Sequence, residues 1–211
     1  MNNLDLALIL IPILLISMSI HEMMHAFVSD WLGDPTARLM GRVSLNPMDH
    51  IDPVFTVALP LLMLLSGGPL IGAAKPVQVN FNRLRFGEYG GAIVGMVGPL
   101  TNLAIAALAA LIFRSLQGDL LTSSLAYNIL RITIELNAAL FIFNSIPWPP
   151  LDGSRLLYAF APRPLQEAME SIERTGWTGL IIFILLISVL GNPLTTIIAK
   201  FIHFLAPGLL I

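Results

Sequence analysis

The sequence contains no cysteine and little charge. The absence of cysteine among its 211 residues excludes disulfide bonds and thiolate metal ligands, so any metal site must use histidine and carboxylate groups. Only 11% of the residues are charged, whereas a soluble domain has about a quarter. The net charge of −2 gives no indication of a nucleic-acid partner. The first five residues lack the basic segment of a signal peptide, so we expect the first apolar segment to be retained.

Long apolar runs dominate the chain instead. Hydrophobic residues make up 56% of it, and several runs approach the roughly 20 residues that a helix needs to cross a bilayer. The sequence therefore predicts a single all-α polytopic membrane domain over 1–211, embedded in a lipid bilayer, with about five to six membrane helices. We expect a three-helix core at about 4–29, 89–113 and 124–160, an amphipathic piece at 162–175, and C-terminal helices at about 177–211.

The segment at about 53–85 does not fit a simple membrane helix. Its apolar run Val54–Leu65 is short and contains Pro60, so we expect 53–72 to enter and leave on one side as a re-entrant segment. Residues 73–88 begin with an alternation that suits a strand or a loop, and Ala37–Val43 suits a small β element. We therefore expect a short re-entrant, β-like segment beside the helices.

Basic residues predict the topology. If 53–72 is re-entrant, the loops 30–52, 73–88 and 147–176 share one face and hold eight of the eleven Lys and Arg residues. By the positive-inside rule that face is cytoplasmic and the N-terminus is outside. We expect a location in the plasma membrane of a prokaryote. Arg131 and Glu135, four residues apart inside the third core helix, are expected to neutralise each other.

The most informative motif lies near the end of the first apolar run. His21, Glu22 and His25 form an H-E-x-x-H pattern, which on a helix places both imidazoles on one face, within reach of one metal ion. Three ionisable groups in a bilayer are costly unless they are paired or bound to metal. The pattern is typical of a zinc hydrolase with one Zn2+, in which Glu22 is the general base and a third ligand comes from elsewhere.

Three residues are candidates for that third ligand: Asp152, His50 and Asp52. Asp152 follows a proline-rich break after the third core helix, where unwound backbone is tolerated only inside protein or beside a wet cavity. Asp152 also suits the N-cap of a helix that begins near Ser154. Asn144 likewise suits a simple cap at the end of the preceding helix. The residues alone leave these interpretations open.

Three motifs together resemble the site-2 protease family of intramembrane zinc metalloproteases. They are His21–Glu22–x–x–His25, the element Gly98–Pro99–Leu100–Thr101–Asn102, and Asn144–x–x–Pro147–x–Pro149–x–Leu151–Asp152–Gly153. The resemblance implies that His21, His25 and Asp152 bind zinc, that Glu22 is the general base, and that Asn144 orients the substrate or stabilises the oxyanion. With the topology predicted from the basic residues, we expect the active site near the cytoplasmic face. The chain looks like a minimal form, without a PDZ-like insertion or a nucleotide-sensing domain.

The function expected from this resemblance is the hydrolysis of peptide bonds in or near transmembrane segments, with a transmembrane protein or peptide as the substrate. Residues Lys75–Phe81 are expected to hold an extended substrate by edge pairing. Two alternatives are a non-catalytic membrane adaptor that binds client helices and a metal transporter. An intact Glu22 argues against the adaptor, and the absence of repeated halves argues against the transporter.

Overall fold

A computed structural model describes residues 3–58, 61–62, 75–116, 124–176, 178–179 and 193–209. Within these ranges the regular structure is helical and contains no strand. Three helices are long and apolar enough to cross a membrane: α1 (Asn3–Trp31), α4 (Glu88–Leu116) and α5 (Leu125–Asn144). At a rise of about 1.5 Å per residue, the 29 residues of α1 or of α4 extend about 43 Å, which exceeds the roughly 30 Å hydrocarbon core of a bilayer.

These three helices match the predicted core segments at 4–29, 89–113 and the first part of 124–160. Shorter elements fill the rest of the described chain: α2 (Thr36–Leu39), η1 (Pro47–Asp49), η2 (Pro53–Ala58), η3 (Phe81–Arg83), α6 (Gly153–Phe160), α7 (Arg163–Arg174) and α9 (Pro193–Leu205). The predicted amphipathic piece at 162–175 is α7. Most of 53–72 and of 177–192 lies outside the described residues, so the re-entrant segment and the count of five to six spans stay predictions.

The prediction of a β element at Ala37–Val43 is wrong. These residues begin with the single turn of α2, and the chain then leaves it in a turn. The cause is Asp34, which is fully buried and whose Oδ1 accepts hydrogen bonds from the N–H and the hydroxyl of Thr36. These bonds bring the chain into a helical turn after Pro35. The alternation at 75–80 likewise forms an extended segment without regular structure, which is the loop alternative.

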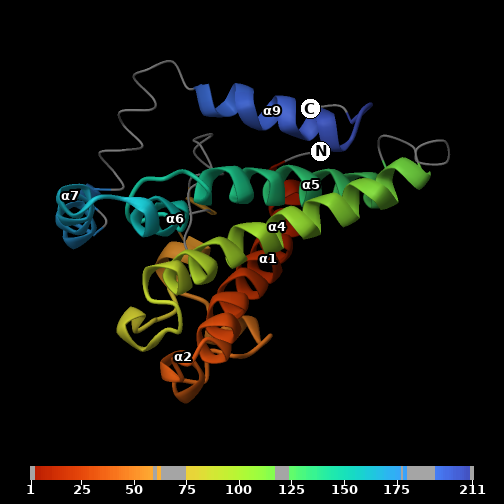
Figure 1. The fold of residues 1–211 in the computed structure, drawn as a ribbon. Helices are drawn as coiled ribbons and strands as arrows, with labels where there is room; N and C mark the ends of the chain where they lie inside the picture. The colour runs from red at the N-terminus through yellow and green to blue at the C-terminus, as the bar shows by residue number, and fades with distance from the viewer. Residues whose placement is uncertain are drawn as a thin grey trace.

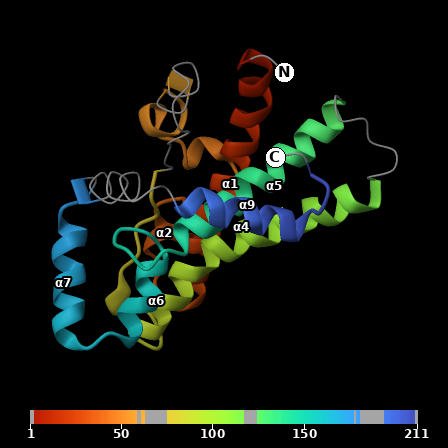
Figure 2. The ribbon, with the colours of Figure 1, turned by 90° about the horizontal axis from the view of Figure 1, so that it is seen from above.

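The core helices pack as a layered bundle (Figure 1). Helix α1 crosses α4, while α5 runs beside α4 and carries α9 on its other side; α6 and α7 lie together at one end (Figure 2). Ala109, Phe113, Ile134 and Ile202 belong to one buried cluster that joins α4, α5 and α9. The predicted pair of Arg131 and Glu135 is present, with 3.8 Å between Nε and Oε1.

The C-terminal ends of α1 and α5 and the N-terminal end of α4 converge. The N–H of Arg85, just before α4, donates to the carbonyl of Leu32 at the end of α1, at 2.8 Å. Helix α6, which follows α5, packs closely on α4 at Gly95, where a Cβ atom would lie 2.8 Å from the carbonyl oxygen of Asp152. Residues from α1, α4 and the α5–α6 connection are therefore brought to one place.

Candidate metal centre

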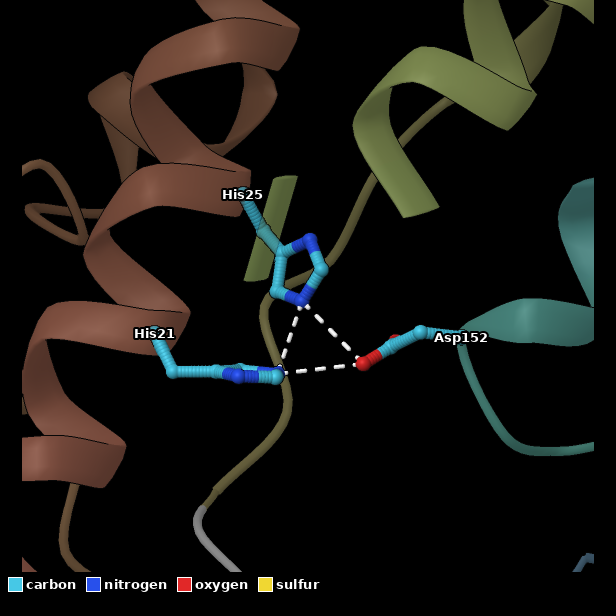
Figure 3. A group of neighbouring side chains, drawn as sticks. All are labelled: His21, His25 and Asp152. Atoms are coloured by element: carbon cyan, nitrogen blue, oxygen red, sulfur yellow. Dashed lines mark hydrogen bonds and ion pairs between the residues drawn. The ribbon is translucent and has the colours of Figure 1, made fainter. Parts of the chain in front are cut away.

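Helix α1 presents His21 and His25 on one face, one turn apart. Both are buried, with 7% of their surface exposed, and their Nε2 atoms lie 3.0 Å from each other. Figure 3 shows the two rings projecting from α1 toward the carboxylate of Asp152. The sequence prediction that both imidazoles reach one point is thus met by the geometry of the helix.

Asp152 completes the group from the start of α6. It occupies the N-cap position, but its side chain makes no capping hydrogen bond. Its Oδ2 instead lies 3.0 Å from His21 Nε2 and 3.5 Å from His25 Nε2. Burial raises the pKa of Asp152, but the charge of His25 and the hydrogen bonds with His21 and His25 lower it by more, so the pKa lies below its ordinary value. The carboxylate faces the histidines rather than the helix that it begins.

The three ligand atoms fit a zinc ion. They form a triangle with edges of 3.0, 3.0 and 3.5 Å. A tetrahedral zinc with ligands at roughly 2.0–2.1 Å separates its ligand atoms by roughly 3.3 Å. Two imidazoles and one carboxylate also form a ligand set known from catalytic zinc sites, and such a set leaves a fourth position open.

Among the residues that the structure describes, this is the one group of three or more His, Cys, Asp or Glu side chains placed to hold a metal. The other two candidates for the third ligand lie elsewhere. His50 is buried with its Nε2 2.8 Å from the carbonyl oxygen of Ser44, and Asp52 accepts a hydrogen bond from the N–H of Val54.

Helix α4 leaves room for the group because residue 98 is glycine. A Cβ atom at Gly98 would lie 2.3 Å from Nε2 of His25 and 2.6 Å from Nε2 of His21. Those are the atoms that face the metal position, so any side chain there would compete with the ion for space. The Gly98–Asn102 element is recognisable in the sequence, but only the structure shows what this glycine does.

Glu22 lines the same cavity as His25 and Asp152, a space of about 330 Å3. Its Oε2 accepts a hydrogen bond of 2.9 Å from the N–H of Val77, in the extended segment 75–80. The carboxylate is thus held beside the metal group, outside the ligand triangle. This is where a base that acts on water next to the metal is needed.

Asn144 is the last residue of α5, and its Nδ2 donates to the carbonyl of Leu140, 3.1 Å away in the same helix. The structure therefore shows a bond to its own helix and no contact with the ligand triangle. The role that the resemblance gives to Asn144 stays a prediction.

Helices α6 and α7 also line the cavity, through Arg155 and Glu173. Arg155 of α6 forms an ion pair with Glu173 of α7, and its guanidinium lies 4.1 Å from the ring centroid of Phe81. Nearby, Tyr158 donates a hydrogen bond of 2.6 Å to Glu170, which raises the pKa of the Tyr158 hydroxyl to about 12. These contacts connect α6 to α7 and to Phe81 at the start of η3.

The sequence did not predict the groups that hydrogen-bond to the two ligand histidines. The Nδ1 atom of His25 lies 2.7 Å from the carbonyl oxygen of Val94, and that of His21 lies 2.6 Å from Oδ1 of Asn102. Asn102 in turn contacts Asn137 of α5. The sequence signal was present, since a polar amide in an apolar membrane helix needs a partner, but the sequence does not say which partner.

Comparison with known proteins agrees with this geometry. The chain is 32% identical over 188 residues to a protein of Bacillus subtilis named "Putative zinc metalloprotease YwhC", covering 87% of this chain and 82% of that protein. It is 28% identical over 175 residues to a protein of Mycolicibacterium smegmatis named "Putative zinc metalloprotease Rip2", covering 82% of this chain and 64% of that protein. No family profile and no solved structure matches the chain. The chain belongs to the site-2 protease family of zinc metalloproteases.

Proposed function

We propose that this protein is an intramembrane zinc endopeptidase that hydrolyses peptide bonds in or near transmembrane segments of membrane proteins. The observation that carries the proposal is the triangle of His21, His25 and Asp152, with Glu22 lining the same cavity. Both histidines lie on a helix that is long and apolar enough to cross a membrane. The names of the relatives support a zinc metalloprotease, and one Zn2+ per chain is the expected cofactor.

In the proposed mechanism, His21, His25 and Asp152 would hold the ion beside the cavity. Zinc bound there supplies Lewis acidity, which polarises a carbonyl group and activates water for attack. Glu22 would accept a proton from the attacking water and transfer it to the leaving amine. Asn144 is proposed to stabilise the oxyanion through an N–H that Leu140 does not use.

The extended segment 75–80 is proposed to hold the substrate. It runs past the cavity, which Pro76, Val77 and Val79 help to line, and its backbone is anchored by three N–H donors. Lys75 donates to the carbonyl of His50, Val77 donates to Glu22, and Asn80 donates to Asp34. Extended backbone held in this way offers its remaining polar groups to an unwound substrate.

Glu22→Gln tests the proposed activity. We expect purified wild type to contain one zinc and to cleave a single-span reporter in detergent. The variant should retain zinc but lose cleavage by roughly 10²–10⁴-fold, the usual contribution of a general base. Equal cleavage by both proteins, or no stoichiometric zinc in folded wild type, would contradict the proposal. Zinc without cleavage in either protein would favour an adaptor or a transporter.

Proline substitution tests the substrate segment separately. Val77→Pro removes the N–H that binds Glu22, and Val79→Pro removes the next N–H two residues along, on the same side of an extended chain. We expect both variants to bind zinc as wild type does and to cleave the reporter more slowly. Unchanged cleavage in both variants would show that the segment does not pair with substrate, and would leave the zinc chemistry intact.

A further inference from the structure

A neutral histidine binds a metal through Nε2 only if the ring proton is on Nδ1. For His25, a backbone carbonyl determines which ring nitrogen carries the proton. Its Nδ1 lies 2.7 Å from the carbonyl oxygen of Val94, and a carbonyl oxygen accepts hydrogen bonds but cannot donate one. Nδ1 of His25 therefore carries the proton, and Nε2 has its lone pair free for the metal.

For His21 the nearest partner does not settle the choice. Its Nδ1 faces the side-chain amide of Asn102 at 2.6 Å. A side-chain amide has an acceptor at one end and a donor at the other, and a rotation exchanges them. If the nitrogen of Asn102 faced His21, the ring proton would move to Nε2 and point into the metal position.

A chain of hydrogen bonds removes this ambiguity. Nδ2 of Asn137 lies 2.9 Å from the carbonyl oxygen of Thr133, which only accepts. The nitrogen of Asn137 is therefore fixed there, and its oxygen faces Asn102 at 2.9 Å. The nitrogen of Asn102 must then face Asn137, its oxygen must face His21, and Nδ1 of His21 must carry the proton.

This chain of hydrogen bonds is buried and joins the three core helices. Asn102 of α4 and Asn137 of α5 have no exposed surface, and Ser17 of α1, whose hydroxyl oxygen accepts the second hydrogen of Asn137 at 3.0 Å, is 2% exposed. Because these side chains are buried, they depend on protein partners for their hydrogen bonds. A rotated Asn137 would set its oxygen against the carbonyl of Thr133, so the orientation of the whole chain depends on that one backbone group.

We propose that Asn102 and Asn137 are positioning residues that hold His21 in its Nδ1–H tautomer, with the Thr133 carbonyl as the fixed end of the chain. The inference rests on the proposed function because it assigns the purpose of this tautomer to metal binding at His21, His25 and Asp152. It adds two residues, from two further helices, that touch neither the metal nor the substrate.

Asn137→Leu is the direct test, because leucine keeps the volume of the side chain and removes its polar ends. Asn102 then loses its fixed partner and can rotate. Zinc affinity, measured by competition with a chelator, should fall roughly 10–100-fold, as for other groups that orient metal ligands. Ala104→Val, an exposed change on α4, is the control and should bind zinc as wild type does.

A second substitution should rescue the first. In Asn102→Asp combined with Asn137→Leu, the carboxylate at position 102 can only accept, so it returns His21 to the Nδ1–H form without help from residue 137. We expect the double variant to recover zinc affinity to within a few-fold of wild type. A purely structural polar clamp between the helices would not be restored by placing a carboxylate there.

Two results would overturn the inference: unchanged zinc affinity in Asn137→Leu, or a double variant that binds zinc as weakly as the single one. If Asn137→Leu does not fold, Asn102→Leu is the alternative test and should weaken zinc binding by a similar factor. A wild type that binds no zinc would refute the proposed function. A wild type that binds zinc, with unchanged affinity in Asn137→Leu, would refute only the role given to the two asparagines.

Discussion

At the scale of single residues, the candidate metal centre depends on the absence of a side chain at position 98. Gly98 lies where a Cβ atom would come within 2.3–2.6 Å of both ligand nitrogens. The position is inside α4, where alanine favours helix over glycine by about 1 kcal/mol. An alanine here therefore opposes metal binding without weakening the helix that carries it.

We expect Gly98→Ala to fold and to lose stoichiometric zinc, because the new methyl group occupies space beside Nε2 of His21 and His25. Zinc content and thermal stability of the purified variant check this. Ala104→Val, an exposed change on the same helix, is the control and should retain zinc. Full zinc occupancy in Gly98→Ala would show that the rings bind the ion elsewhere.

Residue-scale reasoning from the sequence succeeds where local geometry is sufficient. His21 and His25 share a face because a helix repeats every 3.6 residues, and this needs no knowledge of the fold. Asp152 is different. The sequence offers it both as a ligand and as an N-cap, and only the packing of α6 on α4 at Gly95 shows that its carboxylate turns to the histidines. The partner of Asn102 is equally a property of the tertiary structure.

At the scale of elements, the apolar runs predict the long helices well and the polar connections poorly. A run of more than 20 apolar residues has few alternatives to a helix in a bilayer. The polar connection after α1 has many possible conformations, and one buried carboxylate determines which of them forms. Asp34 binds Thr36 on one side and the N–H of Asn80 at 2.6 Å on the other. It thereby shapes α2 and also anchors the distant segment 75–80, which no local pattern reveals.

Asp34→Ala should consequently loosen that segment while leaving the metal group intact. Loss of the bonds to this buried carboxylate should cost about 2–4 kcal/mol of unfolding free energy. Amide hydrogen exchange at Asn80 and Val77 should accelerate, zinc content should not change, and reporter cleavage should slow.

Asp30→Ala is the matched control for this variant. Asp30 lies at the same end of α1, but it forms a surface ion pair with Arg38, and such pairs contribute about 0–1 kcal/mol. Equal effects of the two substitutions on exchange at Asn80 would show that Asp34 is not the anchor.

At the scale of the whole molecule, the candidate metal centre lies where the ends of the core helices converge. The end of α1 is joined to residue 85 before α4, and α6 follows directly from the end of α5. The far end of α4, near Leu116, points away from α6 and α7 in both views (Figures 1 and 2). Residues 30–52, 75–88 and 147–176, with eight of the eleven basic residues, follow the end of α1, precede α4 and follow α5, which is the end that carries the candidate metal centre.

This distribution predicts the orientation in the membrane, and the absence of cysteine makes the prediction easy to test. Single cysteines at two exposed positions, Ser115→Cys at the far end of α4 and Arg163→Cys at the start of α7, report on opposite ends of the molecule. By the positive-inside rule, we expect an impermeant maleimide to label Ser115→Cys in intact cells and Arg163→Cys only after lysis. Wild type has no thiol and should stay unlabelled. The reverse labelling pattern would place the metal centre at the outer face, and an equal pattern would exclude a single orientation.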